Sequence, residues 1–462
     1  MLSIPRRPSH LIAIAGCIAA ALLVIVQPFG LTDQAARPLA LALTVVVLLA
    51  TGALPEHVTA VCCFAVAMLF QLAPSEVVFS GFLSTAFWLV FGGLVISVGV
   101  RRTGLARRIA GLISGRMGTR YAGIIFGVVG IGLALAFLMP STMGRVLILM
   151  PIVLAMADRY GFGAGSNGRT AMVLAMSFGT MLPGFAILPA TVPAVVLVGV
   201  SETLYGISPI YGTWLLLHFP VLGLLKAIAI ALIVIKLFPD TPSAAGEGAV
   251  APPASEGSAG LMFLLLVAAL LLWMTDFVHH ISPAWISLGI AAICVLPFVG
   301  LVPPEAFGKE VSYGTLFYLA IAMALGPLML KSGLVEPTMQ AVLGGIDFEA
   351  GGSLAVFSAV VGFTTLAATV LTHPGVSSGM VPLAESLSQA AGIPLDSVLM
   401  MIVVGFSTVV LPYQTPPLIV AMQLGNVPIS AGNRFCLSLL LVTVVVLLPL
   451  DYLWWLALGQ FG

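Results

Sequence analysis

Long apolar runs follow one another along most of this chain, and short groups of polar, glycine or proline residues separate them. Runs of about 17 to 25 apolar residues are long enough to cross a hydrocarbon core roughly 30 Å thick. Their residues do not alternate between apolar and polar, as the strands of a membrane barrel do. The pattern therefore predicts an all-α, polytopic membrane protein.

The runs fall into two groups. The first group predicts helices over 11–29, 38–52, 56–72, 84–100, 121–139, 144–157, 170–200 and 212–236. The second group predicts helices over 261–277, 283–301, 312–330, 353–371, 376–390, 396–424 and 435–457. Residues 239–260, between the groups, are rich in Pro, Gly, Ala and Ser, which is typical of a flexible linker.

Composition agrees with a membrane protein. Of the 462 residues, 60% are hydrophobic and 7% are charged, whereas about 25% are charged in an average soluble domain. The 17 basic and 17 acidic residues give a net charge of zero, so no nucleic-acid partner is expected. The cysteines lie in apolar segments without metal-ligand spacing, which favours small core residues. They are Cys17, Cys62, Cys63, Cys294 and Cys436.

Arginines predict how the chain is oriented. Six of them lie between Arg101 and Arg120, and the positive-inside rule places such a loop in the cytoplasm. Four predicted crossings separate this loop from Arg6 and Arg7, so the N-terminus is expected on the cytoplasmic side as well. Residues 1–35 have the basic and then apolar layout of a secretory signal. Their apolar part is long and more spans follow, which favours an uncleaved first transmembrane helix in the cell inner membrane.

The two groups of helices resemble repeats of each other. Residues 85–105 and 314–334 align without a gap at an offset of 229, and the same offset pairs "PSE" at 74–76 with "PPE" at 303–305. A constant offset through several polar landmarks is harder to attribute to chance than one match between apolar helices. We therefore expect two structural repeats.

The orientation of the second repeat depends on residues 121–157. If this pair enters and leaves on one side, as a re-entrant hairpin, five spans separate Leu105 from Leu334. An odd number inverts the second repeat, whereas a fully crossing pair would change the parity. Inverted repeats with broken helices are the architecture of secondary transporters. We expect repeat 1 over 36–238, with a hairpin at 121–157 and a broken span at 170–200. A cytoplasmic linker (239–260) follows. Repeat 2 is expected over 261–462, with a hairpin at 353–390 and a broken span at 396–424. About 11 transmembrane helices accompany the two hairpins.

The predicted hairpin tips contain the candidate chemistry. From Ser141 the chain reads "STMGRVLILMPI", and from Thr372 it reads "THPGVSSGMVPL". Tips and breaks leave backbone groups without helical partners, and at membrane depth such groups need protein, ligand, ion or water around them. Helix N-termini at these places suit carboxylate or sulfate oxygens. The hydroxyls of Ser141, Thr142, Thr191, Thr372 and Thr415 are therefore candidate substrate ligands, although hydroxyls in membrane helices also satisfy backbone groups.

Five stretches together resemble the divalent anion/sodium symporter family, whose members move dicarboxylates, citrate or sulfate. The two tips occupy the places of its Ser-Asn-Thr hairpin motifs, with Pro151 and Pro382 downstream, and "LPYQTPPLIV" (411–420) is similar to its Thr-Pro-Pro loop, which adds Pro416 to the candidate site. "PSEVVFSGFLSTAFWLVFGG" and "VPPEAFGKEVSYGTLFYLAIAMALG" look like the segments that lead into its fourth and ninth spans. The resemblance covers nearly the whole chain. It implies a homodimer with a fixed scaffold and a moving transport domain, made of the hairpins and broken spans.

The chain departs from this family at the tips. In sodium-coupled members the tip asparagines help to hold sodium ions and substrate, but here Thr142 and His373 stand in their places. Met143 and Pro374 replace the adjacent threonines. Sodium ions remain possible, because backbone carbonyls are still present. The residues expected at coupling-ion positions are Thr142, His373 and Gly375.

Arg145 stands next to the first tip. An arginine at the membrane centre costs about 2.5–3.5 kcal/mol on insertion scales, so it should face the interior and be paired. It either takes the part of a sodium ion by holding positive charge or binds a substrate carboxylate with two hydrogen bonds. The alternative is that Arg145 extends to the cytoplasmic surface.

His373 has two interpretations. An unperturbed histidine pKa near about 6.5 makes it a candidate carrier of a coupling proton. A neutral histidine hydrogen-bonded to backbone is the alternative. His218, Lys226 and Glu385 are expected to be structural or interfacial, with Glu385 as the one acidic residue that reaches mid-span. His279 and His280, next to Asp276 at the end of a span, are expected in a solvated loop and not in a metal site.

These features favour a secondary active transporter of small anions, either di- or tricarboxylates or sulfate-like ions, working by an elevator-type mechanism. The coupling ion is sodium or a proton. The alternatives are a cation/proton or arsenite-type antiporter of the same superfamily and, in another class, a membrane channel or receptor. The chain shows no catalytic constellation, so it is not expected to be an enzyme. No cofactor is expected apart from possible sodium ions; the expected partners are a small anionic substrate, lipid and a second copy.

Overall fold

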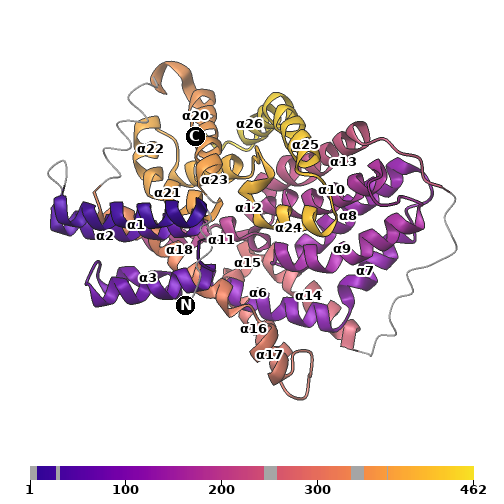
Figure 1. Ribbon diagram of the computed structural model, residues 1–462, viewed down its shortest axis with the longest axis horizontal. Coiled ribbons are helices and arrows are strands. Elements are labelled where there is room, and N and C mark those ends of the chain that lie inside the picture. The colour runs from indigo at the N-terminus through magenta and orange to yellow at the C-terminus, as the bar shows by residue number, and fades with distance from the viewer. Residues whose placement is uncertain are drawn as a thin grey trace.

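The computed structural model describes residues 8–27, 32–51, 53–243, 258–333, 348–371 and 373–461. These residues form helices and no strands, as predicted (Figure 1). Six of their helices are long and apolar enough to cross a membrane, and several shorter apolar helices accompany them. The predicted all-α, polytopic fold is therefore confirmed.

The first repeat contains most of the predicted helices, and a break divides one of its spans. The helices before the break are α1 (Pro8–Val26), α2 (Asp33–Thr51), α3 (Glu56–Leu69), α4 (Ser75–Val78), α5 (Ser80–Leu83), α6 (Thr85–Arg102), α7 (Leu105–Ser114), α8 (Tyr121–Leu138), α9 (Thr142–Arg159) and α10 (Asn167–Met181). Two short turns, η2 (Pro183–Ala186) and η3 (Leu188–Ala190), form the break. After it come α11 (Val192–Tyr205), α12 (Tyr211–His218), the π-helical turn η4 (Phe219–Leu225) and α13 (Lys226–Leu237).

The second repeat has the same plan. It contains α14 (Ser258–Met274), α15 (Asp276–His279), α16 (Pro283–Val295), α17 (Pro304–Glu310), α18 (Tyr313–Lys331), α20 (Phe348–Val370), α21 (His373–Met380), η5 (Val381–Leu383), α22 (Ala384–Ala391) and α23 (Leu395–Phe406). The break follows, with the turn η6 (Pro412–Gln414), and then α24 (Pro416–Leu424), α25 (Ile429–Val442), the π-helical turn η7 (Thr443–Leu447) and α26 (Leu448–Ala457). Compared with the predicted helices, α16 ends six residues earlier and α25 begins six residues earlier.

Helices α8 and α9 form a re-entrant hairpin. At its base, Tyr160 at the end of α9 donates a hydrogen bond to the carbonyl of Gly118, which precedes α8 (3.2 Å). At its tip, Thr142 contacts the carbonyl of Ala190 in the break between α10 and α11 (3.2 Å). Both ends of the pair therefore lie on one side, and the tip lies halfway along the neighbouring broken span.

The second hairpin, α20 to α22, enters from the opposite side. The span α12–η4–α13 runs antiparallel to α25–η7–α26, because Arg434 at the start of α25 reaches the carbonyl of Leu237 at the end of α13 (3.3 Å). The first hairpin has its base at the end of α13, where Tyr121 donates to Phe238. The second has its base at the far end of α26, where Ser353 and Tyr452 are hydrogen-bonded (2.9 Å). The bases of the two hairpins therefore lie at opposite ends of this antiparallel pair of spans, as expected for inverted repeats.

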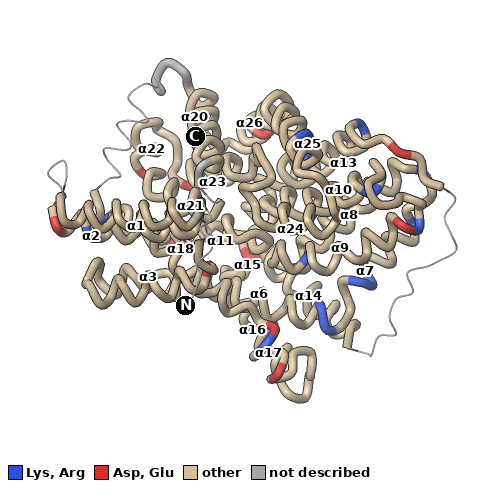
Figure 2. Tube along the Cα trace, viewed as in Figure 1, with Lys and Arg blue, Asp and Glu red and all other residues tan. Residues whose placement is uncertain are grey.

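The charged residues and the linker bear on the predicted organisation. Figure 2 shows few charged residues along the helices in the middle of the molecule, and Lys and Arg around α7, α10 and α13. Of the predicted linker, residues 244–257 lie outside the described residues. The exact division into a first helix, two repeats and a cytoplasmic linker stays a prediction.

Glycines allow the close approach of helices from the two repeats. A Cβ atom at Gly92 of α6 would lie 2.7 Å from the backbone carbon of Ser287 in α16. At Gly289, also in α16, a Cβ atom would meet nothing within 4 Å. These helices therefore pack backbone to backbone on one side and face open space on the other, as small residues permit in membrane bundles.

We expect Gly92→Ala to lower the free energy of unfolding by roughly 1–3 kcal/mol, because the new methyl group overpacks the contact with α16. Thermal unfolding of the detergent-purified protein measures this change. Gly289→Ala is the matched control and should be neutral or slightly stabilising, since the added Cβ has space. Equal stability of the two variants would contradict the close packing of α6 on α16.

Candidate functional site at the two hairpin tips

The first tip is closed by hydrogen bonds from the start of α9. Ser141 is the N-cap, and its Oγ accepts a hydrogen bond from the backbone N–H of Gly144 (3.1 Å). Thr142 donates from Oγ1 to the carbonyl of Ala190 (3.2 Å). The two predicted hydroxyls therefore satisfy backbone groups of the tip and of the adjacent break, as small polar residues commonly do at helix starts.

Arg145, one turn into α9, is wholly buried. Its Nε donates to Thr180 Oγ1 (2.9 Å). Its Nη1 donates to the carbonyls of Ala190 (3.1 Å) and Met139. Its Nη2 donates to the carbonyl of Thr180 (3.0 Å) and to Thr142 Oγ1 (3.1 Å). All five donors of the guanidinium are engaged, and the interpretation that Arg145 extends to the surface is wrong.

No acidic side chain compensates this charge directly. None of the ion pairs among the described residues includes Arg145. Its acceptors include the carbonyl of Thr180 at the C-terminal end of α10, where unpaired carbonyls concentrate negative partial charge. The guanidinium therefore carries a net positive charge into the protein interior, held by neutral oxygens.

The second tip is held in a different way. His373 is 2% exposed, and its Nδ1 lies 2.9 Å from the carbonyl of Gln414 in the second break. Because a carbonyl only accepts, Nδ1 carries the proton of this bond. Nε2 is buried and has no hydrogen-bond partner among the described residues. This geometry fits a neutral histidine.

Gln414 joins the second break to the second hairpin. Its Oε1 accepts from the backbone N–H groups of Val410 (2.7 Å) and Leu411 (2.8 Å). Its Nε2 donates to the carbonyl of Ala368 in α20 (2.7 Å). Reasoning from the sequence missed Gln414, although its place inside the "LPYQTPP" break is a signal, since an amide can donate and accept at once.

The other predicted site residues are distributed around the breaks. Thr191 is buried beside Arg145, and its Oγ1 has no partner among the described residues. Thr415 is buried and Pro416 is exposed at the start of α24. Thr372 lies outside the described residues, and Gly375 is in the first turn of α21. The roles of all predicted site residues remain predictions.

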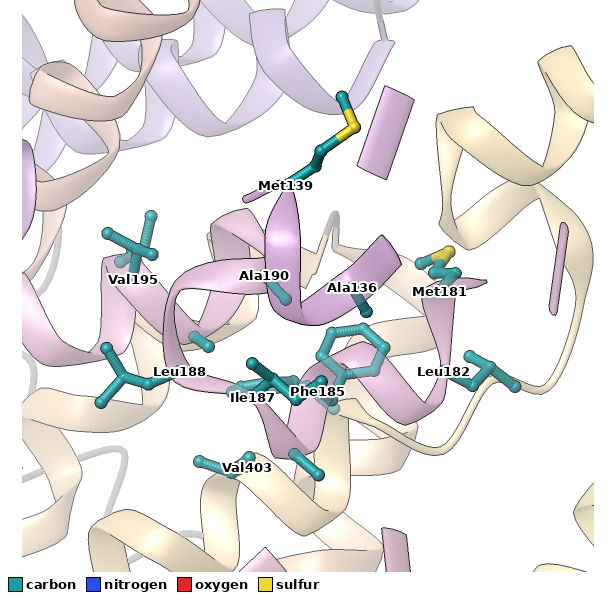
Figure 3. Close-up of a cluster of buried hydrophobic side chains, with 14 of the residues drawn as sticks. Ala136, Met139, Met181, Leu182, Phe185, Ile187, Leu188, Ala190, Val195 and Val403 are labelled. Carbon is teal, nitrogen blue, oxygen red and sulfur yellow. The ribbon is translucent and has the colours of Figure 1, made fainter. Parts of the chain in front are cut away.

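The two tips lie close to each other through the first break. The Phe185 ring is 5.9 Å from the His373 ring and 5.5 Å from the Phe406 ring. Figure 3 shows Phe185 and Ile187 gathered with Val403 of α23 in an apolar cluster. In addition, Ser377 in α21 donates to the carbonyl of Pro193 in α11 (2.9 Å). Elements of both repeats therefore surround one central region.

The polar residues away from the tips differ in their surroundings. Glu385 is exposed, whereas Asp451 in α26, which the sequence reasoning did not single out, is 0% exposed. His218 and Lys226 are wholly buried and not interfacial. Asp276 accepts a hydrogen bond from the backbone N–H of Tyr211 at the start of α12 (2.6 Å). In the part of the chain that the structure describes, no group of three potential metal ligands occurs.

Comparison with known proteins identifies the family. A family model described as "Sodium:sulfate symporter transmembrane region" matches residues 9–461. The chain belongs to this family of membrane transporters. The predicted resemblance to divalent anion/sodium symporters is thereby confirmed.

Two of the relatives are named transporters. The chain is 23% identical over 458 residues to the sodium-dependent dicarboxylate transporter SdcS of Staphylococcus saprophyticus, covering 92% of this chain and 87% of that protein. It is 22% identical over 392 residues to the L-tartrate/succinate antiporter of Escherichia coli, covering 81% and 79%. Among solved structures, the YdaH transporter of Alcanivorax borkumensis has the same general fold, with a TM-score of 0.56. The two chains are 15% identical, and the match covers 83% of this chain and 88% of the YdaH chain.

Arg145→Lys tests the five-donor arrangement. Lysine keeps the charge but carries three donors on one atom, so at least two buried acceptors lose their partner. We expect the free energy of unfolding to fall by about 1–3 kcal/mol for each acceptor left unsatisfied, measured by thermal unfolding in detergent. Arg169→Lys, in a solvent-exposed pair with Asp158, is the control and should change stability little. If both variants match the unsubstituted protein, Arg145 does not hold the tip together.

Proposed function

We propose that this protein is a secondary active transporter of small dicarboxylates across the cytoplasmic membrane. The observation that carries the proposal is the buried guanidinium of Arg145 without a direct acidic partner, next to the hairpin tip and the first break. A fixed positive charge in a site of low dielectric attracts an anion strongly. The names of the two relatives, a dicarboxylate transporter and a tartrate/succinate antiporter, support a four-carbon dicarboxylate.

Arg145 supplies charge and does not bind the substrate directly. All five of its N–H donors are engaged with Thr180, Ala190, Met139 and Thr142, so a substrate carboxylate would have to displace an existing hydrogen bond. The carboxylate is instead bound by groups whose hydrogen bonds are free. Thr191 Oγ1 is buried beside Arg145 and has no partner among the described residues.

The same arrangement supports transport without sodium at the first tip. Carbonyl oxygens and hydroxyls are the ligands that a hard cation takes, and at this tip the guanidinium occupies them. The chain's own cation therefore takes the part of a coupling sodium ion. Movement of the substrate is driven by a proton gradient or by exchange against a second anion, and the antiporter among the relatives is in line with exchange.

The remaining features of the proposal follow from the fold. The two hairpins and the two broken spans form a unit that shifts across the membrane against the other helices, in an elevator-type movement, within a homodimer. The arginines of α7 and its flanking residues lie in the cytoplasm, and so does the N-terminus, by the positive-inside rule. The inverted hairpins then open alternately to the two sides.

Uptake into proteoliposomes tests this function. Labelled succinate, L-tartrate, citrate and sulfate are offered separately, with a sodium gradient or a pH gradient imposed one at a time. We expect saturable uptake of succinate or L-tartrate that does not change when sodium is replaced by potassium. Uptake that requires sodium and ignores pH would contradict the proposed coupling, and failure to transport any of the four anions would contradict the proposed substrate class.

A further inference from the structure

A second group of buried polar side chains lies where the two π-helical turns meet. The turns η4 and η7 interrupt the last long span of each repeat, and these two spans pack antiparallel. Lys226 directly follows η4, and Asp451 is the fourth residue after η7. Single π-helical turns within α-helices occur frequently at functional sites. Two opposite charges therefore lie within about one turn of the two π-helical turns, one in each repeat.

The group is buried and incompletely hydrogen-bonded. Lys226 is 1% exposed, and Asp451 and His218 are 0% exposed. Neither carboxylate oxygen of Asp451 and neither ring nitrogen of His218 has a hydrogen-bond partner among the described residues. The Trp455 indole N–H, one turn beyond Asp451, is the side-chain donor next to this carboxylate but does not reach full hydrogen-bonding geometry with it. Since buried polar groups are normally satisfied, this cluster has unused capacity to bind a proton.

Lys226 joins this cluster to the second broken span. Its Nζ donates to the carbonyl of Ser407 (2.8 Å) and approaches Ser407 Oγ (3.4 Å). Ser407 is the C-cap of α23, where the carbonyl end of the helix favours a cation. In the first repeat, Arg145 donates to the carbonyl of Thr180 near the C-terminal end of α10. Each broken span therefore has a basic side chain of the protein at the end of its first half.

The two basic groups differ in what surrounds them. Arg145 has no acidic partner among the described ion pairs, whereas Lys226 interacts electrostatically with Asp451 without forming a direct salt bridge. The ionisable side chains on the elements around this pair are Tyr211 and His218 on α12, Lys236 on α13, His373 on α21, Asp396 on α23, Arg434 and Cys436 on α25, and Tyr452 on α26. His373 also interacts electrostatically with Lys226, so a protonated His373 would add a second positive charge beside it.

We propose that Asp451 is the proton-binding site that couples transport, and that Lys226 places the resulting charge at the end of α23. This inference rests on the proposed function. When a hydronium ion gives a proton to the Asp451 carboxylate, one O–H bond of the hydronium ion breaks, one O–H bond forms on the carboxyl group, and a water molecule leaves, while Lys226 keeps its proton. The net charge of the Lys226 and Asp451 pair then changes from zero to plus one. With Asp451 protonated, the pair has the same net charge next to an anionic substrate as one bound monovalent cation would have. His373 stays neutral in this state.

Asp451→Asn is the direct test, because it removes proton binding and keeps the shape of the side chain. Uptake of labelled succinate into proteoliposomes is measured with and without an inward pH gradient, together with succinate/succinate exchange, which requires no net proton movement. For the unsubstituted protein we expect accumulation to rise about tenfold per pH unit for each proton carried. For Asp451→Asn we expect equal uptake with and without the gradient, with exchange retained. Glu385→Gln, which changes an exposed carboxylate of the second hairpin, is the matched control and should behave like the unsubstituted protein.

A second measurement does not depend on the variant being folded. A pH-sensitive dye trapped inside the proteoliposomes reports acidification of the lumen when succinate enters through the unsubstituted protein. Acidification by the unsubstituted protein, which requires no variant, supports the inference, and its loss in Asp451→Asn adds support when this variant retains succinate/succinate exchange. Full stimulation of Asp451→Asn by the gradient, or succinate uptake by the unsubstituted protein without acidification, would overturn it and leave anion transport intact. Absence of any succinate, L-tartrate, citrate or sulfate transport would instead contradict the proposed function on which it rests.

Discussion

Backbone carbonyls at the tip of a membrane hairpin need a hydrogen-bond donor, and in the first repeat the hairpin provides it from its own side chain. The guanidinium of Arg145 binds oxygens of Met139 at the tip, Thr180 at the end of α10 and Ala190 in the break. Because lipid offers no alternative donor at this depth, one side chain joins the hairpin and both halves of the broken span. This interaction adds to the hydrogen bonds of Ser141 and Thr142 that close the first tip.

The second repeat meets the same constraint with neutral groups. The Gln414 side chain accepts a hydrogen bond from the backbone of the break and donates one to α20. His373 at the tip is hydrogen-bonded to the backbone carbonyl of Gln414. The positive charge comes from Lys226, which belongs to the first repeat. The two inverted halves thus share a backbone plan but differ in electrostatics. The first broken span lies against a permanent cation without a buried acid, and the second lies against a cation whose effect an acid can cancel. This difference is the physical basis of the proposed transport cycle.

The sequence predicted the architecture well, because apolar runs, helix breakers and arginines act locally. The re-entrant hairpin at 121–157 and the break before Thr415 follow from such signals. The partners of Arg145 in the broken span did not, since Thr180 and Ala190 lie 35 and 45 residues away and accept partly through backbone atoms, which have no sequence signature.

Asp451 was missed for a different reason. It follows a long apolar run and precedes Trp454 and Trp455, a pattern typical of the membrane interface. Only the antiparallel packing of α26 against α12 and η4 buries it. Likewise, the state of His373 depends on Gln414, a residue 41 positions away.

The central claim is that the protein's own side-chain cation replaces a sodium ion at the first tip. The most direct measurement is the shift of thermal unfolding temperature on adding sodium instead of potassium, for the unsubstituted protein and for Arg145→Ala. The unsubstituted protein should show no sodium-specific shift. In Arg145→Ala the vacated carbonyls of Met139, Thr180 and Ala190 become available to a cation, so sodium should stabilise the variant, as a ligand that binds the folded state does. A sodium-specific stabilisation of the unsubstituted protein that is absent from Arg145→Ala would contradict the account.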